Sequence, residues 1–190
     1  MIQAKRKELS WYPMRVTYCQ ELKIKASLDE EGIENFLPMT YRLVETNGDR
    51  HRSLEPAIHN LIFIHSTQER ITQLKMFNKA FSSLRYIMTP SISETSKYSI
   101  MTIREQEMDN FIRVASVNDD STMFLDWTKL VGKVNRRVMV IDGPFAGVNG
   151  VIMRIQKNKH VVVQLKGIAA VAITFVPPAF LKLLDEDDKE

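Results

Sequence analysis

The side chains of this sequence that could bind a metal ion are scattered. No metal-ligand spacing joins the single cysteine, Cys19, to the four histidines, which are His51, His59, His65 and His160. One cysteine can form neither an internal disulfide nor a multi-cysteine metal site, and a lone thiol suits a reducing compartment. We therefore expect no metal site and no cofactor, with Cys19 serving as a buried structural thiol.

The groups that could act in catalysis are equally isolated. The paired carboxylates Glu30-Glu31 and Asp119-Asp120 lie at an expected helix end and in an expected linker, where solvated surface is favoured over acid–base work. The sequence places no general base near Cys19, and it contains no Walker or dinucleotide-binding fingerprint. These patterns predict a binding protein rather than an enzyme.

Charge is distributed unevenly along the chain. Residues 1–131 carry 17 basic and 17 acidic side chains, and residues 132–184 carry eight basic side chains against Asp142 alone. The tail, residues 185–190, has five acidic side chains and Lys189, so the whole chain carries +3. This asymmetry indicates a separate C-terminal unit with an acidic or nucleic-acid-related partner. The plainer alternative is a solvated surface of a small domain.

No apolar run approaches the roughly 18 residues that suggest a membrane span. The basic cluster at the start of the chain has no apolar core behind it, which argues against a secretory signal. We therefore expect a cytoplasmic protein with no membrane partner.

In the first two thirds of the chain, the predicted elements that would position any site alternate between strands and helices. Residues 11–18 are predicted as a strand, although Pro13 should place it at a sheet edge or delay its pairing. A helix over residues 20–31 should end at Gly32, and residues 33–46 should lead through Asn47-Gly48 into a hairpin.

Further along, residues 58–64 are predicted as a buried central strand, 69–78 as a helix and 84–88 as an extended segment. Thr102 and Glu105 match a capping box at the start of a helix. The apolar face of this helix would carry Met108, Phe111, Ile112 and Ala115. The predicted order is β, α, β, β, β, α, β, α, and residues 116–131 lose periodicity and are predicted as a linker.

Short strands separated by turns follow the expected linker. They are predicted over residues 138–141, 150–155, 160–165 and 171–176. Regular short strands of this kind predict a small barrel.

The run from Val138 to Ile155 resembles the KOW motif of NusG-family proteins, with Gly143-Pro144 as a turn and glycines at 147 and 150. KOW motifs also occur in ribosomal proteins that bind RNA. An RNA-binding or ribosome-associated protein is therefore the alternative to a transcription factor.

The N-terminal landmarks favour the transcription factor. Trp11-Tyr12, Phe36–Met39, Glu55-Pro56 and Asn60–Ile64 resemble those of a NusG N-terminal (NGN) domain, and the resemblance covers roughly residues 10–184. It is closer to operon-specific paralogues, the RfaH type and the antiterminators of capsular polysaccharide operons, than to general NusG.

This resemblance implies an α+β fold, in which an NGN domain with an antiparallel sheet flanked by helices is followed by a small all-β SH3-like KOW barrel. The implied domains are the NGN domain at 1–115, the linker at 116–131, the KOW domain at 132–184 and an acidic tail at 185–190.

The resemblance also implies a function. The NGN domain of the family grips the clamp helices of the RNA polymerase β′ subunit and suppresses pausing or termination. The matching positions here are Arg15, Ile58, His59 and Leu61, although the family's usual aromatic residues are absent from them. Packing in the domain core is the alternative for Ile58 and Leu61, and for Leu61 the two assignments are equal.

Further contacts are implied on the helices and in the KOW domain. Thr72 and Gln73 match positions that face the β-subunit gate loop, and Lys23 matches a contact with non-template DNA, with a solvated lysine as its alternative. Phe145 and Ile168 match contacts with Rho or ribosomal protein S10, with packing at the barrel end as the alternative. Valine-rich strands and Gly-Pro turns favour a barrel that does not refold into helices.

Overall fold

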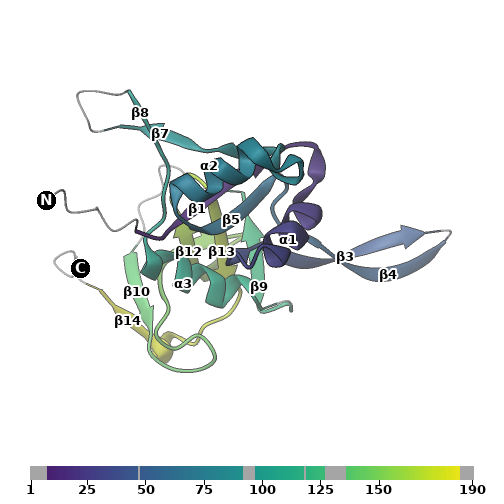
Figure 1. Ribbon diagram of the computed structural model, residues 1–190. Helices are drawn as coiled ribbons and strands as arrows, with labels where there is room; N and C mark the ends of the chain where they lie inside the picture. Colours follow the sequence, from purple (N-terminus) through teal and green to yellow (C-terminus); the bar gives the residue numbers. More distant parts are fainter. Residues whose placement is uncertain (1–7, 47, 92–96, 118, 127–135, 185–190) are drawn as a thin grey trace, which may run out of the picture. The chain divides into compact units, whose positions relative to one another are not determined.

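The computed structural model (Figure 1) describes residues 8–46, 48–91, 97–117, 119–126 and 136–184 of the 190-residue chain. The chain forms two compact units. The first combines residues 1–37 with 59–105, and the second combines residues 38–58 with 106–190.

A four-stranded antiparallel sheet forms the centre of the first unit, in the order β2-β5-β1-β6. Its strands are β1 (Ser10–Val16), β2 (Asn35–Phe36), β5 (Leu61–Ser66) and β6 (Leu84–Tyr86). Leu61 to Ile64 of β5 are all buried, and because successive side chains point to opposite faces, both faces of the sheet are covered at this strand. The prediction of a buried central strand is confirmed, beginning at Leu61.

Pro13 lies in an inner strand, so the expectation of an edge position is wrong. The residue stands opposite Phe63 on β5, but the pairing of β1 with β6 begins only at Met14. The delayed pairing allowed by the sequence is therefore found on the β6 side alone. Proline has no backbone N–H to donate. It is tolerated here because no residue of β6 is paired with Pro13 and would accept such a hydrogen bond.

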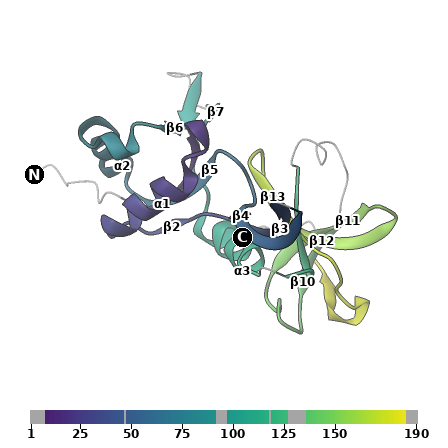
Figure 2. The same cartoon turned by 90° about the vertical axis from the view of Figure 1, so that its right-hand side faces the viewer.

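Two amphipathic helices complete the first unit. The helices α1 (Glu21–Glu30) and α2 (Gln68–Phe77) confirm the two predicted helices, and α1 lies beside β2 (Figure 2). The side chain of Thr67 caps α2 by accepting a hydrogen bond from the Arg70 N–H at 3.2 Å. Their apolar side chains Ile24, Leu28, Ile71 and Leu74 are buried.

The first unit also contains short elements. These are the 3-10 turns η1 (Thr17–Cys19) and η2 (Lys79–Phe81), and a ribbon of β7 (Met88–Pro90) and β8 (Tyr98–Ile100). None of the helices that the structure describes is long and apolar enough to cross a membrane.

The helix α3 (Glu105–Ala115) begins two residues later than the capping box predicts. Ile103 forms an isolated bridge to Trp11, with its N–H donating to the Trp11 carbonyl at 2.9 Å, and this pairing keeps the chain extended there. Thr102 is therefore not the N-cap. The predicted apolar face is buried at Met108, Phe111 and Ala115, together with Val114.

The predicted hairpin is confirmed in the second unit. The strands β3 (Met39–Thr46) and β4 (Asp49–Pro56) pair along their whole length, from Met39 opposite Pro56 to Thr46 opposite Asp49. Gly48 has a φ of +87°, which a turn between such strands requires. Asn47, the other predicted turn residue, lies outside the described residues.

An antiparallel sheet in the order β14-β10-β11-β12-β13-β9 forms the C-terminal all-β domain. The four predicted strands are confirmed with small shifts of their ends. The strands are β9 (Thr122–Leu125), β10 (Arg136–Val140), β11 (Asn149–Ile155), β12 (Asn158–Leu165), β13 (Ala169–Ile173) and β14 (Leu181–Leu183), the last preceded by η4 (Pro178–Phe180).

The strand β9 lies inside the segment 116–131 that the sequence predicts as a linker. It pairs with β13, and its Met123 and Leu125 pack against a buried cluster that includes Met153 and Val162. The described part of this segment therefore supplies a strand of the sheet. Residues 127–131 lie outside the described residues.

Candidate functional site

Arg15 is an exposed side chain near the end of the otherwise mostly buried strand β1. This residue stands opposite Leu61 on β5 and Arg85 on β6, and the two arginines are exposed. Arg15 makes no ion pair among the described residues. Like charges directly opposite each other repel, so the surface that carries these two arginines is suited to contact an acidic surface.

The other three positions of the expected patch differ in exposure. Leu61 is only 5% exposed, which favours its alternative assignment as a core residue. Ile58 is half-buried and His59 is exposed. The accessible part of the expected patch therefore consists of Arg15, His59 and part of Ile58.

The turn after β1 and the turn before β5, which lie next to these residues in the sequence, have strained backbone conformations. Tyr18, Cys19 and Asn60 have positive φ values of 65°, 50° and 60°, a backbone region that costs non-glycine residues energy. The carboxylate of Glu21, which is only 2% exposed, accepts a hydrogen bond from the Asn60 N–H, and the Asn60 carbonyl accepts one from the Val16 N–H at 3.0 Å.

His59 therefore precedes a residue whose N–H and carbonyl are both hydrogen-bonded, and Tyr18 in the neighbouring turn is 85% exposed. Cys19 is also exposed, so the expectation of a buried thiol is wrong. Tyr18 and Asn60 are not among the site residues expected from the sequence. The tolerance of asparagine for the left-handed region is the only sequence signal that could have indicated this turn.

On α2, the two expected gate-loop residues have different environments. The Thr72 hydroxyl lies 2.8 Å from the Gln68 carbonyl and 3.0 Å from the Tyr86 hydroxyl, whereas Gln73 is exposed. The Lys75 ammonium lies 4.2 Å from the centre of the Tyr86 ring. Burial and then the nearby Arg85 charge lower the pKa of Lys75, and burial raises the pKa of Tyr86.

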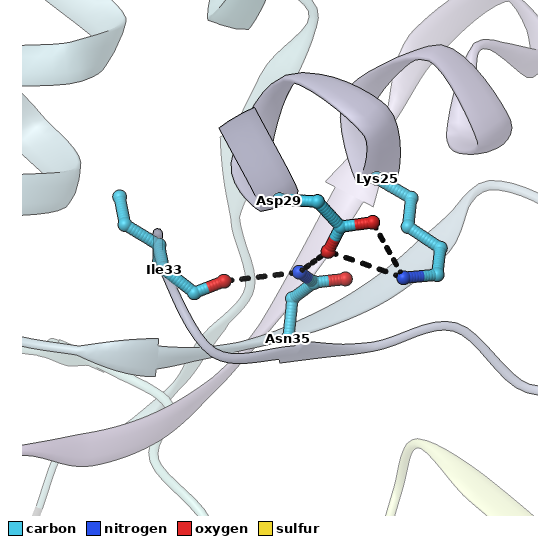
Figure 3. Close-up of polar contacts among 4 residues, drawn as sticks. All are labelled: Lys25, Asp29, Ile33 and Asn35. Atoms are coloured by element: carbon cyan, nitrogen blue, oxygen red, sulfur yellow. Dashed lines mark hydrogen bonds and ion pairs between the residues drawn. The ribbon is translucent and has the colours of Figure 1, made fainter. Parts of the chain in front are cut away.

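Lys23 is exposed on α1, in agreement with either of its two assignments. The helix that carries it is anchored by a polar network (Figure 3). The Lys25 ammonium lies 2.9 Å from an Asp29 oxygen, and the Asn35 amide donates to Asp29 at 2.7 Å and to the Ile33 carbonyl at 3.0 Å. The hydrogen bond from Lys25, followed by that from Asn35, lowers the pKa of Asp29.

A second cluster, absent from the expected sites, surrounds His65. Its ring stacks on Trp11 with centroids 4.8 Å apart, its Nδ1 lies 2.6 Å from a Glu34 oxygen, and its Nε2 lies 3.4 Å from a Glu105 oxygen. These residues are far apart in the sequence, so no local pattern links them. The four residues of this cluster come from β1, β5, the segment before β2 and the start of α3.

In the KOW region, the turn after β10 buries Phe145, which is 8% exposed. The Gly147 N–H donates to the Val140 carbonyl at 2.6 Å, and the Ala146 N–H donates to the Gly143 carbonyl at 3.1 Å. This burial favours the alternative assignment of Phe145, packing at the barrel end, over direct contact with a partner. Ile168 is half-buried in the turn between β12 and β13.

Metal-ligating side chains do not converge in the part of the chain that the structure describes. No group of three or more histidine, cysteine, aspartate or glutamate residues there could hold a metal ion.

Comparison with known proteins gives two matches to family models. The family described as "Transcription termination factor nusG" matches residues 9–112, and the KOW motif matches residues 134–166. No curated protein matches the chain. A solved structure described as "Domain interaction in Thermotoga maritima NusG" is 14% identical, with a TM-score of 0.43 and a match covering 94% of this chain and 98% of that chain.

Proposed function

Because this chain belongs to the NusG family, we propose that it binds the β′ clamp helices of RNA polymerase through its NGN domain and suppresses pausing or termination. Members of the family are non-enzymatic transcription elongation and antitermination factors that bind RNA polymerase. The match of the family model to residues 9–112 is the observation that carries this proposal.

The accessible residues of the expected patch support this contact. Arg15 has no ion-pair partner among the described residues, and His59 is exposed beside a turn that Glu21 holds. A preorganised surface loses little conformational entropy on binding, so these residues are suited to a protein interface. Ile58 would add apolar contact area, and Leu61 would support the surface from the core.

We assign the contact with the β-subunit gate loop to Gln73, because the neighbouring Thr72 hydroxyl is already bonded within the protein. Lys23, which is exposed on α1, would contact a phosphate of the non-template DNA strand. In the KOW domain, Ile168 would contact Rho or ribosomal protein S10, with the buried Phe145 supporting the loop beneath.

The direct test is an affinity purification of the full chain from an RNase-treated bacterial extract, scored for polymerase β and β′. We expect Ile58→Asp and His59→Glu to abolish enrichment, while Leu183→Asp, an exposed change on the C-terminal domain, preserves it. The thermal midpoint of each variant checks that it is folded. Enrichment unaffected by both patch variants would contradict the proposed contact.

The alternative function is RNA binding or ribosome association by the basic C-terminal domain. Residues 132–184 carry eight basic side chains against Asp142 alone. This function predicts recovery of RNA without polymerase in an untreated extract, and an affinity that falls steeply with salt.

We propose that the protein acts in specific operons of the polysaccharide type rather than generally. Mapping its chromosomal occupancy tests this point. Occupancy of one or a few operons is the expected result, and occupancy of most transcribed operons would instead assign a general NusG role.

A further inference from the structure

The C-terminal sheet contains a pocket that the expected Rho or S10 contacts do not include. Its volume is about 300 Å³, and its apolar lining consists of Ile152, Val161, Val176, Pro178, Leu181 and Leu183. Lys159 and His160 complete the lining. The expected contacts Phe145 and Ile168 lie on other loops, between β10 and β11 and between β12 and β13.

Basic side chains gather beside this pocket on the same face of the sheet. Residues directly opposite each other in an antiparallel pair share a face. Ile152 is paired with Arg136 on one side and Val161 on the other, and the next same-face pair is Arg154 with Lys159. Three cations therefore adjoin two residues of the apolar lining.

No acidic side chain among the described residues neutralises these cations. Arg136, Arg154 and Lys159 are exposed, and none of them forms an ion pair among the described residues. The sequence from 143 to 184 contains no acidic residue. Arg154 directly opposite Lys159 is a repulsive pair, and an anionic ligand would relieve this repulsion.

The chemistry of the pocket favours an anionic ligand with an apolar side chain over single-stranded RNA. Its lining is aliphatic, whereas single-stranded RNA is recognised by aromatic stacking and by hydrogen bonds to base edges. A volume near the lower limit of ligand pockets suits one large apolar side chain. Leu183, 54% exposed, gives such a side chain an accessible wall.

We propose that this basic-rimmed pocket binds an acidic peptide segment of a partner protein. One aliphatic side chain of the segment enters the pocket, and neighbouring carboxylates pair with Arg136, Arg154 and Lys159. The inference does not rest on polymerase binding by the NGN domain.

The test uses the full chain and fluorescence polarisation with three labelled probes. These are an acidic peptide with one central leucine, the same peptide with alanine in its place, and a polyuridine strand. The leucine peptide should bind at least about tenfold more tightly than the alanine peptide, as burial of a leucine side chain requires. It should also bind more tightly than polyuridine at physiological salt.

Variants locate the binding site. Leu183→Asp and the double charge reversal Arg154→Glu, Lys159→Glu should each weaken the leucine peptide about tenfold or more, and Lys166→Glu, an exposed control in the turn after β12, should not. Amide shifts in the NMR spectrum should centre on Ile152, Val161 and Leu181. All variants are exposed positions, and retained spectra verify their folding.

Three outcomes would overturn the inference. Equal affinity for the two peptides would show that charge alone accounts for the binding and that the leucine does not enter the pocket. Tighter binding of polyuridine than of the leucine peptide would assign the surface to nucleic acid. Shifts centred on Phe145 and Ile168 would place the peptide at the other end of the domain. Polymerase recovery by the same variants is a separate readout, so failure here leaves the NGN proposal unaffected.

Discussion

At the scale of single residues, the strained turn beside β5 depends on one buried carboxylate. Glu21 is 2% exposed and accepts a hydrogen bond from the N–H of Asn60, a residue in the left-handed region. Its position in the first turn of α1 also places negative charge where the helix favours it. Glu21 therefore couples the helix to the loop that carries His59.

We expect Glu21→Ala to lower the free energy of unfolding by about 1–2 kcal/mol, because it removes a hydrogen bond to a carboxylate and leaves the partly buried Asn60 N–H without its acceptor. Urea denaturation measures the change. Glu30→Ala, an exposed position on the same helix, is the matched control and should change stability by less than about 0.5 kcal/mol. Equal effects of the two substitutions would show that the bond to Asn60 contributes nothing.

Asp29 should make stability depend on pH. Its hydrogen bonds with Lys25 and Asn35 lower its pKa in the folded state below the ordinary value of 3.8. The contribution is therefore present above that value and is lost as pH falls through the folded pKa. Asp29→Asn should lower the free energy of unfolding by less than about 1 kcal/mol at neutral pH, because the side chain is half-exposed. It should also flatten the acid limb of the stability curve, which is the decrease in stability that the wild type shows as pH falls into the acid range.

Thermal unfolding at a series of pH values tests this prediction. Asp109→Asn, an exposed position on α3, serves as the control and should leave the acid limb of the wild-type curve in place. An acid limb of the same slope in Asp29→Asn and wild type would contradict the assignment.

At the scale of elements, the close approach of β11 and β12 requires a glycine. A Cβ at Gly150 would lie 2.8 Å from Val161 Cγ1 and 2.9 Å from the Val162 carbonyl oxygen, and the backbone oxygen cannot move away easily. Gly167 has open space around its Cα but a φ of +81°. The two glycines are therefore needed for different reasons.

We expect Gly150→Ala to destabilise the C-terminal domain by about 1–3 kcal/mol through overpacking. Gly167→Ala should cost about 1 kcal/mol through backbone strain alone. Calorimetry on the full chain measures both. A Gly150→Ala variant as stable as wild type would show that the strands can separate without cost.

The pairing of β9 with β13 leads to a second prediction at the scale of elements. Met123→Asp would place a charge against the cluster around Met153 and Val162, so hydrogen exchange of the β13 amides should accelerate about tenfold or more. Asp120→Asn, before the strand, is the control. Unchanged protection of β13 would mean that β9 adds no stability to the sheet.

At the scale of the whole molecule, charge separates a neutral N-terminal part from a basic C-terminal domain and a short acidic tail. Residues 185–190 carry five acids and one lysine, a net charge of −4, so their removal changes the net charge of the chain from +3 to +7. The tail thus limits the affinity of the protein for polyanions.

We expect a chain that ends at Leu184 to elute from heparin at higher salt than the full chain, and to show a steeper dependence of RNA affinity on salt. Substitution of the five tail acids by their amides should have the same effect at constant length. Identical elution of all three forms would show that the tail does not screen the basic domain.

The sequence by itself determined the local elements. The helix 21–30 follows from the helix propensity of its residues, and the helix 68–77, the hairpin of β3 and β4 and the short C-terminal strands follow from periodicity and from turn residues such as Gly48. All of these signals act within a few residues. The two-domain architecture followed from the family resemblance, which the family models confirm.

Only the tertiary structure decided which side chains are accessible. Pro13 in an inner strand, the burial of Leu61 and Phe145, and the pairing of β9 with β13 depend on partners distant in the sequence. The cluster around His65 is another such case. A local pattern reports the conformation that a segment prefers, whereas burial depends on the segments that pack against it, and long-range pairing sets those.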